Sequence, residues 1–174
     1  MATRVRKRQL NRFERVLENF AASKAGGWFY VNVANKVDAP LLRMSNGRIS
    51  LSVGQPVLLL TTRGAKSGKP RAAPLLYMLD GDRIILIASK AGNLRHPSWY
   101  HNVKAHPDVD VKAKGRSGRY RAREAEGEER ERLWEIANDQ YRGYDVYQER
   151  AGDRRIPVIV LERGAAATTP AGAA

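Results

Sequence analysis

The sequence contains no cysteine. The protein therefore has no disulfide bond, no thiolate metal site and no cysteine nucleophile. It also lacks any apolar run that approaches the roughly 20 residues of a membrane-spanning helix. The N-terminus is basic, but no apolar stretch follows it, so we expect no secretory signal peptide. These absences favour a protein of the reducing cytoplasm.

Positive charge, by contrast, is abundant. The 174 residues include 31 Lys and Arg against 18 Asp and Glu, which gives a net charge of +13. Such an excess favours anionic partners, such as a phosphate-bearing ligand, nucleic acid or an acidic lipid surface. Hydrophobic residues make up 43% and charged residues 28% of the chain, which is the balance of a globular protein. The length suits a single domain.

The N-terminal segment has the pattern of a basic amphipathic helix over residues 4–22. Four apolar residues, spaced three and four apart, fall on one face of it: Leu10, Phe13, Leu17 and Phe20. We expect residues 1–45 to form a helical extension that either packs on the domain or faces an anionic membrane surface.

Short apolar or alternating segments dominate the rest of the chain. Helices are expected over residues 98–105 and from Glu128 onward, and strands over 57–62, 73–79, 83–89, 109–113, 119–125 and 156–161. The Asp80-Gly81-Asp82 turn between two of these runs predicts a β-hairpin. Strands and helices do not alternate regularly, which argues against a parallel Rossmann sheet. The order predicts an α+β fold, a small antiparallel barrel with attached helices.

The loop over residues 63–71 joins two apolar strands and carries four basic residues. Gly64 and Gly68 allow the backbone to turn and to approach a ligand closely. Successive N–H groups in such a turn can bind an anion, and Ser67 and Lys66 add a hydroxyl and a charge. The loop matches neither GxxxxGK[ST] nor GxGxxG. It is interpreted either as an anion-binding loop or as a solvated turn.

Two further segments combine polar and aromatic side chains. Residues 88–92 follow an apolar strand and place Lys90 just past its end. Residues 96–102 bring Trp99 and Asn102 to one helix face. Such a surface suits a flat, partly anionic ring system, and core packing is the alternative explanation of the aromatic residues.

Three tyrosines, Tyr141, Tyr144 and Tyr147, recur at a spacing of three residues. This spacing clusters them on one side of a helix or turn. Their hydroxyls can orient a carbonyl or quinone oxygen, or donate a proton. The alternative is an aromatic patch that covers the mouth of the barrel.

The histidines do not have the spacing of metal ligands. His96, His101 and His106 recur every five residues, which does not place them on one helical face. The chain also has no GxSxG motif and no obvious pair of catalytic carboxylates. We predict no metal site.

Taken together, these segments resemble the deazaflavin-dependent nitroreductase family, which includes quinone reductases that use reduced coenzyme F-420, an 8-hydroxy-5-deazaflavin. The resemblance covers about residues 53–163 and is carried, in order, by LLLTTRGAKSGKPRAAPLLY, ASKAG, HPSWYHN, QYRGYDVY and IPVIVLER. It implies an antiparallel split β-barrel, like that of FMN-binding oxidoreductases, over residues 46–164. N-terminal and peripheral helices would surround the barrel, and residues 165–174 would form a disordered tail.

The resemblance also implies a coenzyme site. The residues that would bind the coenzyme are Ala65, Lys66, Ser67, Arg71, Ala72, Ala73, Pro74, Leu75, Leu76, Ile87, Ala88, Ser89, Lys90, Ser98, Trp99, Tyr100, His101, Asn102 and Tyr144. The residues that would line the substrate pocket are Tyr141, Tyr144 and Tyr147. Residues 93–96 depart from the pattern, because some members carry small or acidic residues there.

The implied reaction is hydride transfer from reduced F-420 to a quinone, a nitroaromatic compound or an unsaturated carbonyl compound. Negative charge then develops on the acceptor oxygen, where a hydroxyl stabilises it. We predict that Tyr144, with Ser89, performs this catalytic role and supplies a proton.

Other functions remain open at this point. One is an FMN-binding oxidoreductase of the same barrel type, and another is a non-enzymatic basic protein that binds nucleic acid or a membrane. Nucleic acid is not expected, because the basic residues are spread over loops and the N-terminal segment without a known reading element. The expected partner is a small-molecule electron acceptor. The expected location is the cytoplasm, with peripheral contact to the inner face of the cell membrane through the N-terminal helix.

Overall fold

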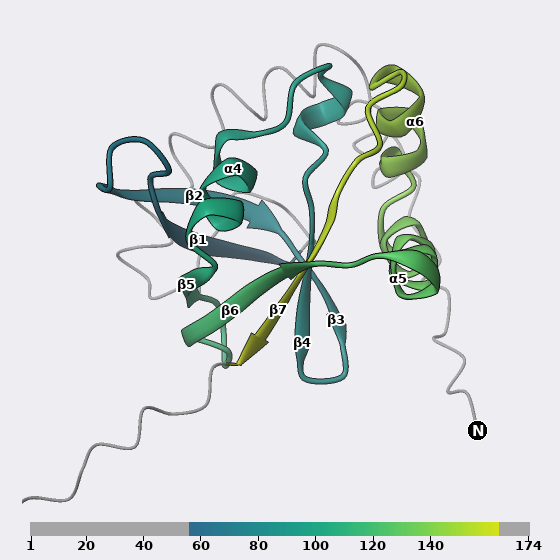
Figure 1. The fold of residues 1–174 in the computed structure, drawn as a ribbon. Coiled ribbons are helices and arrows are strands. Elements are labelled where there is room, and N and C mark those ends of the chain that lie inside the picture. The colour runs from purple at the N-terminus through teal and green to yellow at the C-terminus, as the bar shows by residue number, and fades with distance from the viewer. Residues whose placement is uncertain (1–55, 164–174) are drawn as a thin grey trace, which may run out of the picture.

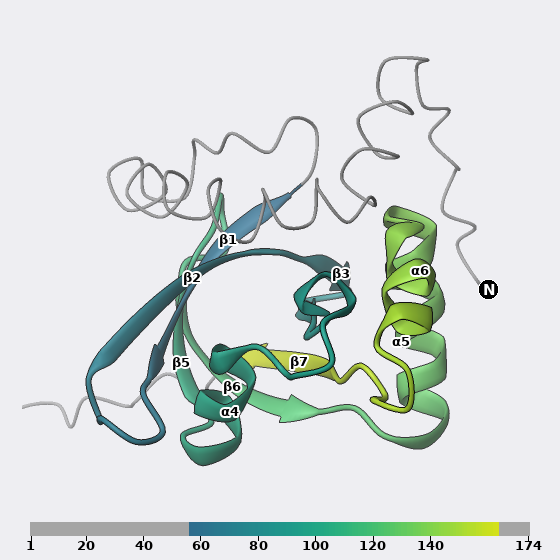
Figure 2. The same cartoon turned by 90° about the horizontal axis from the view of Figure 1, so that it is seen from above.

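The computed structural model describes residues 56–163 of the chain. Seven strands form one antiparallel sheet in the order β2-β1-β5-β6-β7-β4-β3. The sheet curls into a half-barrel, and helices cover it inside the curl and on one outer face (Figures 1 and 2). The predicted antiparallel barrel with peripheral helices is therefore confirmed. The expected helical extension over residues 1–45 and the tail over 165–174 lie outside the described residues.

The bounds of the elements follow the sequence closely. The strands are β1 (Val57–Arg63), β2 (Pro70–Leu76), β3 (Met78–Asp80), β4 (Arg83–Ile87), β5 (Asp108–Lys112), β6 (Gly118–Glu124) and β7 (Val158–Arg163). The helices are α4 (Ser98–Ala105), α5 (Gly127–Gln140) and α6 (Gly143–Arg150), with a short 3-10 turn, η2 (Lys90–Gly92). Within residues 56–163, no helix is both long and apolar enough to cross a membrane.

The strands bury side chains on both faces of the sheet. Inside the curl, Leu58, Leu86 and Leu161 pack against Trp99 and Val103 of α4. On the outer face of β4 and β7, a second cluster lies beneath α5 and α6; its members include Ile85, Ile87, Val158, Val160 and Leu133. Each fully buried aliphatic side chain stabilises the fold by about 1.5–3 kcal/mol relative to exposure. Two apolar clusters therefore hold the helices in place on opposite faces.

One expected strand is interrupted in the structure. Residues 73–79 were expected as one strand, but the chain breaks at Tyr77, whose N–H donates to the carbonyl oxygen of Pro56 at 3.2 Å. Before the break, β2 pairs with β1; after it, β3 pairs with β4. Both halves are apolar, so the sequence does not indicate that the chain changes its partner strand from β1 to β4 at this point. The hairpin predicted at residues 80–82 is confirmed, with Asp80 opposite Arg83.

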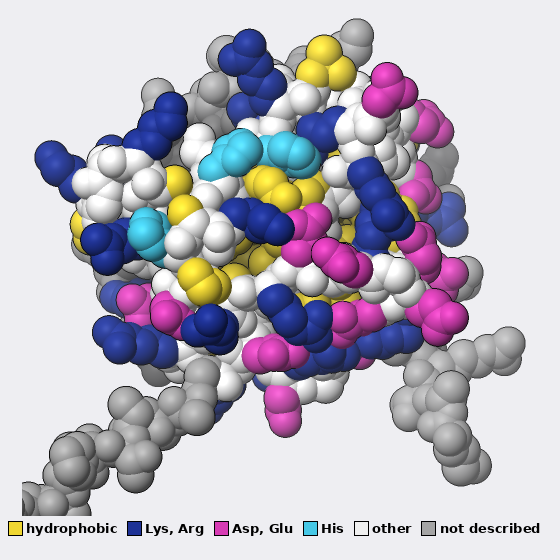
Figure 3. All heavy atoms as spheres, viewed as in Figure 1, with side chains coloured by type: hydrophobic (Ala, Val, Ile, Leu, Met, Phe, Trp, Pro, Cys, Tyr) yellow, Lys and Arg dark blue, Asp and Glu magenta, His cyan; other side chains and the backbone are white. Residues whose placement is uncertain are grey.

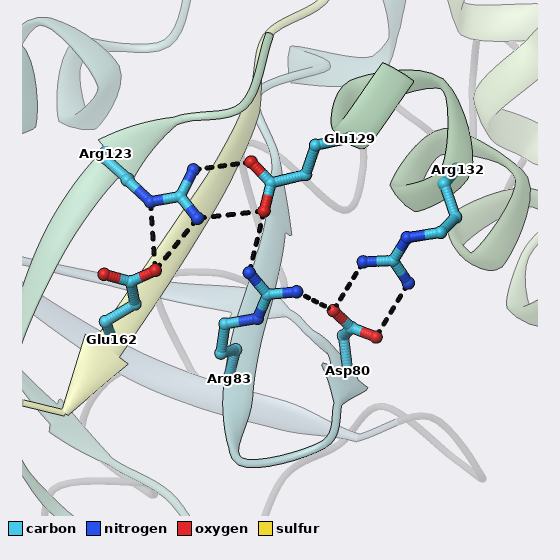
Figure 4. A network of polar contacts seen from close by, with 6 residues as sticks. All are labelled: Asp80, Arg83, Arg123, Glu129, Arg132 and Glu162. Atoms are coloured by element: carbon cyan, nitrogen blue, oxygen red, sulfur yellow. Dashed lines mark hydrogen bonds and ion pairs between the residues drawn. The ribbon is translucent and has the colours of Figure 1, made fainter. Parts of the chain in front are cut away.

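Ion pairs join the N-terminal part of α5 to the sheet (Figure 4). Arg123 of β6 contacts Glu129 at 2.6 Å and Glu162 of β7 at 2.9 Å. Glu129 also pairs with Arg83 at 2.7 Å. The network continues through Asp80, which contacts Arg83 and, at 2.9 Å, Arg132. This six-residue network connects the β3–β4 hairpin, two further strands and the helix.

Candidate functional site

The loop between β1 and β2 is a compact turn. The Gly64 N–H donates to the Lys69 carbonyl oxygen at 2.9 Å, and the Gly68 N–H donates to the Gly64 carbonyl oxygen at 2.8 Å. Gly68 has φ +65°, a conformation that disfavours other residues. Residues 65–67 and 69–71 of this turn are exposed.

The four cations of this loop have no acidic partner in the described part of the chain: Arg63, Lys66, Lys69 and Arg71. Most arginines on the β5–β6 face and around α5 are, by contrast, paired with carboxylates. In Figure 3, Lys and Arg side chains project over the β1–β2 loop on the left, whereas acidic side chains gather on the opposite side, over α5 and α6. The loop is therefore a concentrated, uncompensated positive surface, as an anion site requires.

Helix α4 holds this loop through one buried side chain. Asn102, 8% exposed, accepts a hydrogen bond at Oδ1 from the Ala65 N–H at 3.0 Å. Its Nδ2 donates to Thr62 Oγ1, also at 3.0 Å. The Thr62 hydroxyl donates in turn to the Arg71 carbonyl oxygen at 3.3 Å. The amide of Asn102 is therefore engaged within the protein, where it connects the helix to both ends of the loop.

The segment after β4 has an unusual backbone. Lys90 and Ala91 have φ of 50° and 53°, and Gly92 follows with φ 77°. A left-handed conformation costs a residue other than glycine roughly 1–2 kcal/mol, and such strain concentrates at functional sites. Ser89 is 8% exposed, yet its hydroxyl forms no hydrogen bond with residues 56–163. Lys90 is half-buried and has no carboxylate partner among those residues.

The three predicted tyrosines form one cluster. Tyr141 ends α5, and Tyr144 and Tyr147 lie on α6. The hydroxyls of Tyr141 and Tyr147 are hydrogen-bonded at 3.0 Å, and the Tyr144 ring lies edge-on to Tyr141 at 5.2 Å between centroids. All three are less than 10% exposed, and burial raises the pKa of Tyr147. The clustering predicted from their spacing is confirmed.

The strained turn brings this tyrosine cluster next to β4. A Cβ atom on Gly92 would lie 2.8 Å from the Tyr147 carbonyl oxygen, so the turn can approach α6 only with glycine at this position. Ile87 packs with the tyrosines, whereas Ala88 packs with Trp99 inside the curl. The end of β4 therefore links the tyrosine cluster to the α4 side of the site.

The aromatic residues of α4 differ in their surroundings. Trp99 lies in the inner core and is 8% exposed. Tyr100 is half-buried; burial and a hydrogen bond from its hydroxyl to Glu124 at 3.0 Å raise its pKa to about 12. His101 is exposed, and its ring lies edge-on to the ring of His96, with 5.9 Å between the ring centroids. Burial, together with the positive charge of Arg154, lowers the pKa of His96.

The strand β2 places its predicted residues on two faces. Ala73 and Leu75 are partly buried against the inner core, whereas Ala72 and Leu76 pack on the outer side with Val57 and Leu59 of β1. Pro74 is buried, and Ser98 at the start of α4 is exposed. The predicted β2 residues therefore form an edge of the half-barrel that presents apolar atoms to both sides.

Sequence reasoning missed two residues that shape the site. Arg154, in the connection between α6 and β7, donates hydrogen bonds to the segment after β4. Gly143 lies so close to Tyr141 that a Cβ atom would be 2.3–2.5 Å from its ring and hydroxyl atoms. The sequence offered no signal for Arg154, one of two adjacent arginines. The glycine between two predicted tyrosines was a usable signal for Gly143.

A curled antiparallel sheet whose β1–β2 loop carries cations without acidic partners among the described residues, and whose α5–α6 side holds a cluster of buried tyrosines, defines a split-barrel protein that can hold an anionic coenzyme. The chain belongs to the F420H(2)-dependent quinone reductase family, whose model matches residues 34–163. This membership confirms the predicted family, the oxidoreductase class and dependence on coenzyme F-420, and it favours that coenzyme over FMN.

Individual relatives agree with the family. An F420H(2)-dependent quinone reductase of Mycobacterium tuberculosis is 41% identical over 128 residues, which cover 71% of this chain and 85% of the relative. A solved F420-H2 dependent reductase is 45% identical with a TM-score of 0.55, covering 62% of this chain and 94% of that chain. A solved domain-swapped dimer is 41% identical with a TM-score of 0.59, and the match covers 73% of this chain and 97% of that chain.

Proposed function

We propose that this protein transfers a hydride from reduced coenzyme F-420 to a quinone-type acceptor, and that the loop over residues 63–71 holds the anionic part of the coenzyme. The observation that carries the proposal is the set of four exposed cations on this loop without an acidic partner among the described residues. The arginine guanidinium binds phosphate and carboxylate groups through two parallel hydrogen bonds, and the lysine ammonium binds them as a single positive charge.

The turn after β4 fits the ring end of such a coenzyme. The Ser89 hydroxyl is buried without a hydrogen bond from residues 56–163, and the nearby Lys90 carries an uncompensated charge. A buried polar group usually has a partner, so a ligand oxygen or nitrogen is the natural one here. Ile87 and Ala88 would support the ring from β4, and Ala72 to Leu76 from β2. The bound deazaflavin would supply the hydride.

Helix α4 would close the other side of the coenzyme site. Ser98 and His101 are exposed on this helix and would contact the ligand directly. Trp99 and Asn102 are buried and would act by fixing the helix against the core and the loop. Tyr100 keeps its proton at neutral pH, because its pKa is raised to about 12.

The tyrosine cluster would bind and protonate the acceptor. Burial raises the pKa of Tyr147, so this phenol keeps its proton at neutral pH. A neutral hydroxyl can donate to the acceptor oxygen as negative charge develops on it. We assign orientation of the acceptor to Tyr141 and Tyr147, and proton donation to Tyr144 with Ser89.

The charge of the loop provides the test. We expect Lys66→Gln and Arg71→Gln each to weaken F-420 binding about three- to tenfold, because each removes one charge-assisted contact at an exposed site. The matched control is Lys112→Gln, an exposed lysine on β5 outside the loop. Coenzyme affinity is measured by titration at several salt concentrations. Equal affinities in all three variants and the parent protein would contradict the assignment of the loop.

We also propose that the protein works in the cytoplasm and meets its acceptor at the inner membrane face. The support is the basic amphipathic pattern of residues 4–22 in the sequence. The test is sedimentation with anionic and neutral liposomes, comparing the full chain with a variant in which the six basic residues of this segment become Gln: Arg4, Arg6, Lys7, Arg8, Arg12 and Arg15. Equal sedimentation of both proteins would contradict membrane contact.

A further inference from the structure

The turn that carries Ser89 and Lys90 is not held by its own backbone bonds alone. Within it, the Gly92 N–H donates to the Ser89 carbonyl oxygen and the Asn93 N–H donates to the Lys90 carbonyl oxygen, each at 3.1 Å. These two bonds close the turn, but they leave three consecutive residues in the left-handed region. A strained segment persists only when its surroundings over-determine it.

One side chain from a distant part of the chain supplies that restraint. Arg154 lies in the connection between α6 and β7 and is half-buried. Its Nη2 donates to the Ser89 carbonyl oxygen at 2.8 Å, and its Nε donates to the Asn93 carbonyl oxygen at 2.9 Å. Its Nη1 reaches the Ala88 carbonyl oxygen at 3.3 Å. The planar guanidinium therefore joins the residues before the turn to the residue after it.

The same guanidinium also fixes the side chain of His96. Its Nη1 lies 3.2 Å from Nδ1 of His96. Arginine has donors only, so Nδ1 of His96 accepts this bond and the ring proton resides on Nε2. Burial, followed by the charge of Arg154, lowers the pKa of His96, in agreement with a neutral ring. Arg154 thereby orders the segment from Ala88 to the start of α4.

No carboxylate among the described residues pairs with Arg154, and its hydrogen bonds go to backbone oxygens and an imidazole. Its neighbour Arg155 is different: that side chain is exposed and pairs with Glu131 at 2.5 Å. Lysine could not replace Arg154 fully, because its single ammonium group cannot reach all the acceptors that the three guanidinium nitrogens contact.

We propose that Arg154 is a positioning residue of the coenzyme site: by bonding to both ends of the turn, it holds Ser89 and Lys90 where the deazaflavin binds. This inference rests on the proposed function. It predicts that removal of the Arg154 guanidinium makes the turn more mobile, weakens coenzyme binding and leaves the affinity for the acceptor almost unchanged.

The test compares Arg154→Gln and Arg154→Lys with the matched control Arg155→Gln in the full chain. The measurements are Kd for F-420, KM for a water-soluble naphthoquinone at saturating reduced coenzyme, and amide hydrogen exchange without coenzyme. We expect Arg154→Gln to raise Kd about tenfold or more, since several bonds to a charged donor are lost. Arg154→Lys should lie between this variant and the parent protein, and Arg155→Gln should match the parent.

Hydrogen exchange separates the inference from the proposed function. In Arg154→Gln we expect faster exchange at the amides of Gly92 and Asn93, with the sheet amides unchanged. Unchanged exchange, or unchanged F-420 affinity, would overturn the positioning role, and Arg154→Lys decides the question should Arg154→Gln not fold. Failure of the parent protein to bind F-420 would overturn the proposed function, while the exchange comparison would still show whether Arg154 holds the turn.

Discussion

Oδ1 of Asn102 accepts a hydrogen bond from the Ala65 N–H at 3.0 Å, across 37 positions of sequence. This contact ties the cationic loop to a helix whose other buried residues, Trp99 and Val103, belong to the inner core. The amide of Asn102 therefore connects the core directly to the loop. A coenzyme that binds the loop consequently depends on a residue that need not contact it.

Replacement of Asn102 tests this dependence. We expect Asn102→Ala to lower the free energy of unfolding by about 1–3 kcal/mol, because the Ala65 N–H loses its acceptor and the Thr62 oxygen loses the donor from Asn102. It should also weaken F-420 binding. Thr62→Val is the control, because it keeps the bond of Asn102 to Ala65 and removes the two bonds of the Thr62 hydroxyl, to Asn102 and to Arg71. A coenzyme affinity lowered equally by both variants would show that the bond to Ala65 is not what matters.

If Tyr144 donates the proton, removal of its hydroxyl should strongly lower turnover. Tyr144→Phe removes the hydroxyl and keeps the ring, which packs against Tyr141 and Trp134. We expect kcat with a quinone acceptor to fall about 100-fold or more, since general acid catalysis typically contributes that much. F-420 affinity should change little. Turnover at the parental rate would remove Tyr144 from the mechanism, and Ser89→Ala would then be the next variant to assay.

The close approach of Gly143 to Tyr141 predicts strong intolerance of any side chain. In Gly143→Ala, the new methyl group would overlap the phenol ring, displace it and break its bond to Tyr147. We expect a loss of about 1–3 kcal/mol in the free energy of unfolding. The cost should nearly vanish when Tyr141→Ala is the starting protein. An equal cost with and without the Tyr141 ring, in a double-mutant cycle, would show that the clash is not its cause.

The network of Figure 4 predicts how stability depends on pH. Hydrogen bonds from Arg132 and Arg83 lower the pKa of Asp80 from 3.8 to about 2, and those from Arg123 and Arg83 lower the pKa of Glu129 from 4.5 to about 2. Because the folded-state values are depressed, the stabilisation is complete above about pH 5 and is lost as the pH falls toward 2.

Each carboxylate should contribute on the order of 1 kcal/mol after solvent screening. The measurement is the free energy of unfolding by denaturant between pH 6 and pH 2. The double variant Asp80→Asn with Glu129→Gln should be less stable at pH 6 and show a shallower decline. A decline as steep as that of the parent protein would mean that other carboxylates dominate acid unfolding.

The fold, the clustering of the three tyrosines and the exposed basic loop could be predicted because local patterns carry them. The apolar runs of β1, β4 and β7, the spacing of Tyr141, Tyr144 and Tyr147, and the basic loop are all visible within short stretches of sequence. The break at Tyr77 and the role of Arg154 were not predictable. Both depend on contacts with residues far away in the chain: Tyr77 bonds to Pro56, just before β1, and Arg154 bonds to Ser89, 65 positions earlier.

The most direct test of the account is to mix the protein with reduced F-420 and a quinone and to follow the absorbance of the oxidised coenzyme as it returns. The account predicts coenzyme oxidation at a rate proportional to protein concentration, with reduced quinone formed in equal amount. Rates should fall as salt screens the cationic loop. Absence of coenzyme oxidation with every quinone tested, together with no measurable binding of F-420, would contradict it.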